Sequence, residues 1–146
     1  MRSTILPLLL SGAVAACAPS AAGGGEDEPA QATRGEMTGV EWSLVELNGA
    51  PAPLGAGDRP ATLTLGDSAR ASGFGGCNRI AGSYELAGDS LRFGPLISTR
   101  MACDQGMELE QAYGAALEAT RRFRVTEAGL ELLGADGVIA RFRAAP

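Results

Sequence analysis

The chain has 146 residues and a formal net charge of −5, and it contains no histidine and no lysine, so all 12 basic side chains are arginines. Without those residues the chain alone cannot form a Ser-His-Asp relay, an imidazole metal site, a Schiff-base lysine or a phosphate-binding loop that uses lysine. The acidic balance argues against nucleic-acid binding, and the length is that of one domain.

A signal peptide is predicted at residues 1–16. Arg2 gives a minimal positive start, an apolar run follows it, and the small residues Ala15 and Ala16 precede Cys17. The apolar run is shorter than the roughly 20 residues that a membrane-spanning helix requires. We therefore expect this segment to be removed from the mature protein.

A lipid anchor is predicted at Cys17, because the segment 14–17 (Val-Ala-Ala-Cys) resembles a bacterial lipobox. Diacylglycerol and an N-acyl chain on Cys17 would exceed the two lipid signals that stable anchoring requires. By resemblance to sorted lipoproteins, Ala18 after the cysteine favours the outer membrane facing the periplasm in a Gram-negative host. The alternative is an ordinary secretory signal with an incidental cysteine. The expected localisation is the cell envelope, with the protein lipid-anchored at Cys17.

Residues 17–38 are interpreted as the lipidated cysteine and a flexible linker, and residues 39–146 as the folded domain. The linker is rich in alanine, glycine, proline and acidic residues, including Glu26-Asp27-Glu28. Such a segment cannot bury enough apolar surface to order itself. The run Gly23-Gly24-Gly25 is interpreted as spacing, since no strand precedes it and no helix follows, as a phosphate-binding loop would require.

Short segments of alternating apolar and polar residues, bounded by turn sequences such as Asn48-Gly49, predict a mostly antiparallel sheet. One later stretch has helical spacing instead, with apolar residues on one face from Leu109 to Thr120. Asp104 is its expected N-cap, and Arg121-Arg122 suit its C-terminal dipole. The predicted fold class is α+β, a curved, partial-barrel-like sheet with one amphipathic helix packed on it. The expected strands are 40–47, 61–65, 69–74, 79–86, 90–93, 122–126, 130–133 and 138–142.

A disulfide is predicted between Cys77 and Cys103. If Cys17 carries lipid, these two remain as an even pair outside the cytoplasm, where thiols tend to oxidise. A redox role is less favoured because the spacing is far from Cys-x-x-Cys, and two thiolates without histidine make a poor zinc site.

Three motifs resemble the META (HslJ-like) domain family, which includes heat-shock lipoproteins. They are Trp42-Ser43-Leu44 with Leu47-Asn48-Gly49, the segment 72–79 (Ser-Gly-Phe-Gly-Gly-Cys-Asn-Arg), and the segment 98–103 (Ser-Thr-Arg-Met-Ala-Cys) with Glu110. Their order and spacing match across residues 40–143. The resemblance implies an association with the cell envelope, stress response and drug tolerance, and no established enzymatic activity.

The residues near the predicted disulfide have two interpretations. Asn78, Arg79, Thr99 and Arg100 could bind a carboxylate or phosphate, which makes them the candidate binding site. The alternative, which the residue types favour, is a structural network in which Asn78 satisfies a turn and the arginines pair with acids such as Glu110 or cap carbonyls.

Other side chains also have a functional and a structural interpretation. The glycines at 73, 75 and 76 are expected to permit positive φ or a bulge, with a ligand-cradling loop as the alternative. Met101 and Met107 could bind a soft metal, but core packing is the preferred interpretation, as it is for Trp42 and Phe74.

The sequence thus predicts a non-enzymatic envelope lipoprotein that binds a protein or a small ligand and supports stress or drug tolerance. We expect no catalytic residues, no cofactor, no metal and no nucleic-acid partner. The alternative function is a carrier of a small apolar or anionic molecule in a pocket between sheet and helix. Such a carrier would leave unfilled space near Leu63, Leu91 and Leu117.

Overall fold

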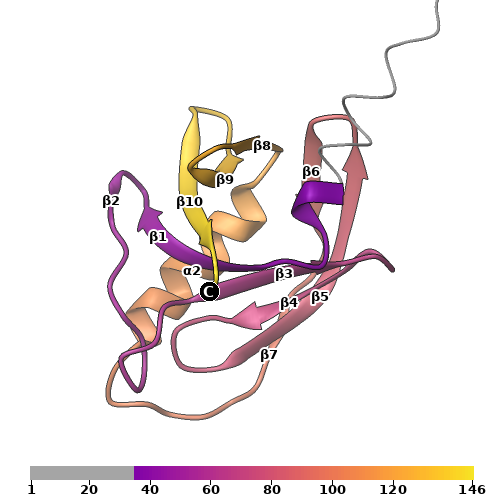
Figure 1. Ribbon diagram of the computed structural model, residues 1–146. Coiled ribbons are helices and arrows are strands. Elements are labelled where there is room, and N and C mark those ends of the chain that lie inside the picture. The colour runs from indigo at the N-terminus through magenta and orange to yellow at the C-terminus, as the bar shows by residue number, and fades with distance from the viewer. Residues whose placement is uncertain (1–34) are drawn as a thin grey trace, which may run out of the picture.

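The computed structural model describes residues 35–146, so the predicted signal peptide, Cys17 and most of the linker lie outside the described residues (Figure 1). None of the helices in this described part is long and apolar enough to span a membrane. The elements are β1 (Glu41–Leu47), β2 (Ala50–Pro51), β3 (Thr62–Gly66), β4 (Arg70–Phe74), β5 (Arg79–Ala87), β6 (Ser90–Phe93), β7 (Ile97–Ser98), α2 (Met107–Ala119), β8 (Arg122–Thr126), β9 (Gly129–Leu133) and β10 (Val138–Ala144).

The strands form a closed antiparallel barrel of eight strands. The order runs β10-β9-β8-β6-β5-β4-β3-β1, and β10 pairs with β1 to close the ring. Two short strands lie outside the ring, because β2 pairs with β1 and β7 pairs with β5. The predicted curved sheet with one helix is therefore confirmed, although the sheet closes fully and the fold is mostly β.

Alternation along the strands decides which side chains fill the barrel. In β3, Leu63 and Leu65 are fully buried, whereas Thr62 and Thr64 face outward and are half-buried. Successive side chains of a strand point to opposite faces of a sheet, so this period of two separates the core from the outer surface. The turn after β1 has positive φ at Asn48 and Gly49, as a tight hairpin requires.

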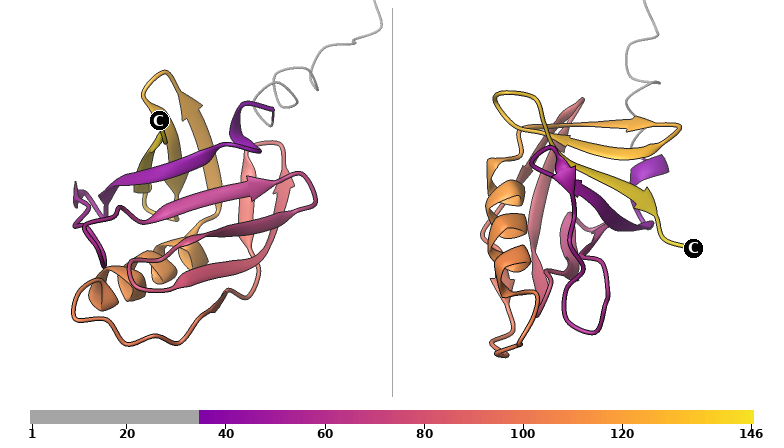
Figure 2. Two further views of the ribbon diagram at one scale, coloured as in Figure 1. Left: turned by 60° about the horizontal axis from the view of Figure 1, so that its bottom comes forward. Right: turned by 90° about the vertical axis from the view of Figure 1, so that its left-hand side faces the viewer.

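Helix α2 covers one side of the barrel (Figure 2) with Leu109, Tyr113, Ala116 and Leu117 buried against the core. Tyr113 lies with its ring centroid 6.1 Å from that of Phe142 and donates a hydrogen bond to the Thr62 carbonyl at 3.1 Å. Desolvation in this position raises the pKa of the Tyr113 hydroxyl above its ordinary value.

The predicted N-cap of this helix is wrong. The cap is Gly106 with φ of 92°, and it makes no side-chain cap hydrogen bond. A Cβ atom at Gly106 would lie 2.1 Å from the Gly76 carbonyl oxygen, so the close approach of the β4–β5 turn excludes any larger residue. At the other end, the Arg121 guanidinium donates to the Glu118 and Thr120 carbonyls, as its place in the sequence predicts.

Candidate functional site

The predicted disulfide joins Cys77 and Cys103, whose Cα atoms are 5.9 Å apart. It ties the turn between β4 and β5 to the segment that leads from β7 into α2. The glycine before Cys77 makes this approach possible, because Gly76 has φ of 134° and an added Cβ would lie 2.6 Å from the Gly106 carbonyl oxygen. The expectation of positive φ in this glycine run is confirmed at Gly76.

Asn78 is the centre of a hydrogen-bond network beside the disulfide. Its side chain is 3% exposed, and its Nδ2 donates to the Met101 carbonyl at 3.2 Å and to Glu110 Oε1 at 3.0 Å. Its Oδ1 accepts from the Met101 amide at 2.7 Å and from the Thr99 hydroxyl at 3.1 Å. Two donors and two lone pairs are the full capacity of a carboxamide, so the structural interpretation accounts for all of it.

Glu110 completes the network from helix α2. Its Oε2 accepts from the backbone amides of Cys77 at 3.1 Å and Asn78 at 2.5 Å. An added Cβ at Gly75 would lie 2.9 Å from Glu110 Cγ, which explains a glycine there. The carboxylate therefore serves backbone amides, and the expected pairing with an arginine is not observed in the described residues.

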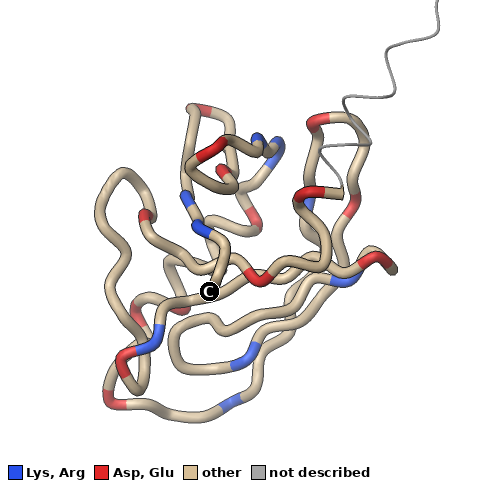
Figure 3. Tube along the Cα trace, in the orientation of Figure 1, with Lys and Arg blue, Asp and Glu red and all other residues tan. Residues whose placement is uncertain are grey.

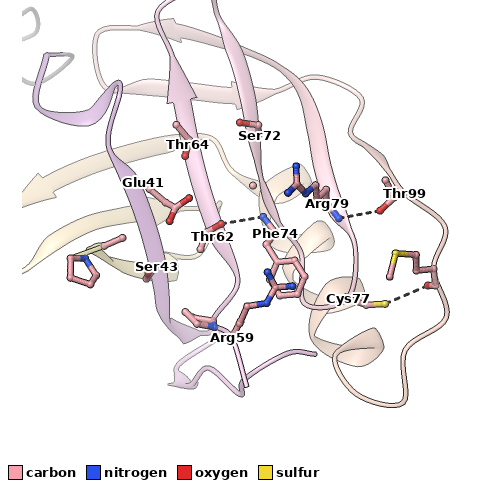
Figure 4. A pocket seen from close by; sticks show the side chains of 15 residues that line it. Glu41, Ser43, Arg59, Thr62, Thr64, Ser72, Phe74, Cys77, Arg79 and Thr99 are labelled. Atoms are coloured by element: carbon pink, nitrogen blue, oxygen red, sulfur yellow. Dashed lines mark hydrogen bonds between the residues drawn. The ribbon is translucent and has the colours of Figure 1, made fainter. Parts of the chain in front are cut away.

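A groove of about 960 Å³ lies on the outside of the barrel, next to this network (Figure 4). Its floor consists of outward-facing residues of β1, β3 and β4. Arg59, from the loop before β3, and Arg79, from β5, also line it, and Glu41 is the only acidic residue among its lining residues. The floor and rim carry the hydroxyl groups of Ser43, Thr62, Thr64, Ser72 and Thr99.

Strand register explains why these residues meet. Ser43 is opposite Thr62, Thr62 is opposite Phe74, and Phe74 is opposite Arg79. Directly opposite residues share a face of the sheet, so the four side chains form one row across the outer surface of the barrel. Their positions in the sequence span 36 residues, since 79 − 43 = 36, and only the strand pairing brings them together.

Phe74 lies in this row and is covered by Arg59, whose guanidinium carbon is 4.1 Å from the ring centroid. Phe74 is 8% exposed, yet it stands outside the core cluster to which Trp42 belongs. Both aromatic residues are therefore buried as predicted, Trp42 within the core cluster and Phe74 beneath Arg59 on the outer face of the barrel. A cation above an aromatic face is attracted by the ring quadrupole, so Arg59 both shields the ring and keeps its charge at the groove.

The two methionines near Cys103 are also not core residues, contrary to the preferred interpretation. Met101 is 62% exposed and lines the groove, and Met107 is 46% exposed at the start of α2. The segment after β7 runs along the outside of the barrel, held by the disulfide and by Asn78, so its side chains do not reach the interior. Among residues 35–146 no group of three or more histidine, cysteine or acidic side chains is placed to hold a metal ion.

Figure 3 shows where the charged residues lie along the chain, and the salt bridges divide the arginines into paired and unpaired ones. On strands β8 to β10, Arg124 and Arg141 both pair with Glu131, and Arg141 also pairs with Glu46 of β1. Burial alone would raise the pKa of Glu131, but the hydrogen bonds and charges of the two arginines outweigh it and leave that pKa below its ordinary value. The bond to Glu131 likewise raises the pKa of Arg141.

By contrast, Arg59, Arg79 and Arg100 make no ion pair with any described residue. Of the four candidate binding residues, Arg79 and Thr99 line the groove, Asn78 lies beneath it in the hydrogen-bond network, and Arg100 is exposed on the adjoining segment. Sequence reasoning missed Arg59 and the hydroxyl-bearing floor, because neither carries a local motif.

The three leucines expected near a carrier pocket belong to the hydrophobic core cluster. Leu63, Leu91 and Leu117 are each 0% exposed and line neither the outer groove nor the smaller hollow of about 400 Å³.

Comparisons with known proteins give one consistent result. The sequence profile of the META domain matches residues 35–146. An NMR structure of a protein from Burkholderia xenovorans has a TM-score of 0.62 and 30% sequence identity, with 96% of this chain and 99% of that chain covered. Another NMR structure of a protein has a TM-score of 0.59 and 25% identity, with 75% and 93% covered. No curated protein is significantly similar in sequence.

Proposed function

Because the chain belongs to the META domain family, whose barrel here carries two unpaired arginines in an outer groove, we propose that it is a non-enzymatic envelope lipoprotein that binds an anionic ligand and so supports stress or drug tolerance. The observation that carries this proposal is the pair Arg59 and Arg79, which line one groove without a carboxylate partner among the described residues.

The chemistry of the groove favours a carboxylate or a phosphate. A guanidinium group donates two parallel hydrogen bonds to either anion, and this geometry adds specificity to the charge attraction. Hydroxyl groups on Thr64 and Ser72 can donate to further oxygens of the same ligand. Glu41 lies in the same groove, so a ligand that also carries a donor group would match it best.

Two features support a non-enzymatic function. The groove hydroxyls have no histidine or lysine to act as a base, since the sequence contains neither. The groups with clearly shifted pKa values, which are Tyr113, Glu131 and Arg141, do not line the groove. Perturbed pKa values at a cleft are the usual accompaniment of acid–base catalysis.

Calorimetric titration of the full-length protein, purified from host membranes in detergent, tests ligand binding. Pyrophosphate and succinate are the probes, because they distinguish phosphate from carboxylate preference. We expect Arg79→Gln and Arg59→Gln to weaken binding of the preferred anion about tenfold, the loss of roughly one charge-assisted bond. Arg92→Gln, an exposed arginine outside the groove, is the matched control. Equal weakening by all three variants, or no binding of either anion, would contradict the proposal.

Intact mass spectrometry before and after reduction and alkylation tests the anchor. A chain that starts at Cys17 with a diacyl or triacyl mass, and two alkylated thiols only after reduction, is expected. An unlipidated chain would remove the membrane from the proposal.

A genetic experiment tests whether the groove is needed for stress tolerance. A strain that lacks the gene is complemented with the wild type, with Arg79→Gln or with Arg92→Gln. Tolerance of envelope stress should be restored by the wild type and by Arg92→Gln, but not by Arg79→Gln.

A further inference from the structure

Strand β7 has a neighbour on one side only. It pairs with β5 through Ile80 and Ser98 and through Ala81 and Ile97. The Thr99 amide continues this pairing by donating to the Arg79 carbonyl at 3.1 Å. No other strand in the described part of the chain pairs with β7, which therefore lies at an edge outside the closed ring (Figure 1).

The alternation of an antiparallel strand fixes which backbone groups are free. Amides and carbonyls of successive residues point to opposite sides, and the Thr99 amide points toward β5. The Met101 amide also points inward, to the Asn78 side chain. The backbone groups of Ser98 and Arg100, which lie between these positions, therefore face away from the barrel and are free to pair with an added strand.

The side chains along this edge are also uncovered. Every residue from 97 to 102 is exposed, and Ile97 is 72% and Met101 62% exposed. Ile97, Thr99 and Met101 share one face of the strand, so an apolar side chain at each end flanks a hydroxyl. The other short edge strand, β2, ends at Pro51, which cannot donate to a partner strand. Strand β7 has no such protection.

We propose that the edge formed by β7 and the three residues that follow it, 99–101, captures an extended acidic segment of another protein by strand addition. Main-chain hydrogen bonds to Ser98 and Arg100 would give affinity, and branched apolar side chains would pack on Ile97 and Met101. The charge of the site favours an acidic occupant, because Arg100 lies in the edge and Arg79 lies on the neighbouring strand β5, and neither forms an ion pair within residues 35–146. A second copy of this chain would place those arginines against their own counterparts, which disfavours pairing between copies. This edge adjoins the groove, which Thr99 and Met101 also line, but the backbone groups that would pair belong to Ser98 and Arg100, which do not line the groove.

Hydrogen exchange with a model strand tests the geometry. The probe is an octapeptide of alternating glutamate and valine, with alternating lysine and valine as its counterpart, added to the full-length protein in detergent. We expect the glutamate peptide to slow exchange at the Ser98 and Arg100 amides at least tenfold and to leave Thr99, whose amide is already bonded, unchanged. Equal slowing by both peptides, or slowing confined to other residues, would overturn the proposal.

Two variants measure the contribution of the edge to affinity. Ser98→Pro removes an outward amide that forms no bond within the chain, and it should weaken the glutamate peptide at least tenfold. Arg100→Glu should weaken it similarly and reverse the preference toward the lysine peptide, while Arg92→Glu should do neither. Melting temperatures close to wild type show that each variant is folded. Peptide affinity unchanged in Arg100→Glu, or a homodimer that forms through this edge, would refute the assigned occupant.

Discussion

Replacing Asn78 by aspartate separates the hydrogen-bond network from simple packing, because the two side chains have almost the same shape. After the change, Oδ1 can still accept from the Thr99 hydroxyl and from the Met101 amide. The donor Nδ2, however, becomes a carboxylate oxygen 3.0 Å from Glu110 Oε1. Asn78→Asp therefore places two carboxylates in contact in a site that is 3% exposed at residue 78.

The expected loss of stability in Asn78→Asp can be estimated for two states of the carboxylate pair, one with both groups charged and one with a single shared proton. Two unit charges at 3.0 Å repel each other by about 5 kcal/mol at an effective dielectric constant of about 20. The pair can instead take up one proton, and holding a proton at pH 7 on a group of ordinary pKa about 4 costs about 4 kcal/mol. The folded variant adopts whichever of these two states costs less free energy, which is the protonated pair. We therefore expect Asn78→Asp to lower the free energy of unfolding by about 3 to 4 kcal/mol at pH 7.

The pH dependence has a definite sign. The folded variant holds a proton that its unfolded state releases, so its stability relative to wild type rises as the pH falls. Near pH 4.5 the remaining loss should be about 1 kcal/mol, from the bond to the Met101 carbonyl. Urea unfolding followed by the fluorescence of the single tryptophan, Trp42, measures both values with the disulfide intact.

The double variant provides the control. Glu110→Gln added to Asn78→Asp restores a donor opposite the new carboxylate and keeps an oxygen for the Cys77 and residue 78 amides. It should recover most of the stability at pH 7 and remove the pH dependence. A loss of stability in Asn78→Asp that is the same at pH 4.5 and pH 7, or no recovery in the double variant, would refute the network as described.

Four further variants test other parts of the structure. Glu131→Gln should cost about 1 kcal/mol at pH 7, since its arginine partners are half-exposed, and the difference should vanish as the pH falls below the lowered pKa of Glu131. Serine at both Cys77 and Cys103 should cost about 3.5 kcal/mol in denaturant unfolding, the chain-entropy value for a separation of 26 residues. Gly76→Ala should cost at least about 2 kcal/mol, because its φ is 134° and a Cβ meets a carbonyl. Gly114→Ala, in open space on α2, should stabilise the protein by about 0.5 to 1 kcal/mol. Equal effects of the two glycine variants would contradict the close approach at Gly76.

Local patterns were sufficient for the helix and for the eight strands of the barrel. The alternation in 61–65 and the helical spacing from Leu109 onward place the right side chains inside, because both periods depend only on neighbouring residues. Cys77 and Cys103 could be paired by counting on the expectation that Cys17 carries lipid, and the structure joins these two.

Only the tertiary structure decided how these elements assemble. Closure of the barrel pairs Trp42 with Ala144, which are about as far apart in sequence as the domain allows, and no local pattern specifies that register. The same register places Phe74 on the outer face under Arg59 and brings Arg79 beside it. The sequence by itself therefore determined the eight strands of the barrel, the helix and the disulfide, because those depend on spacing along the chain, but it missed the two-residue strands β2 and β7, which form only by pairing with β1 and β5. The groove, the network around Asn78 and the free edge of β7 depend on distances across the barrel, which only strand pairing sets.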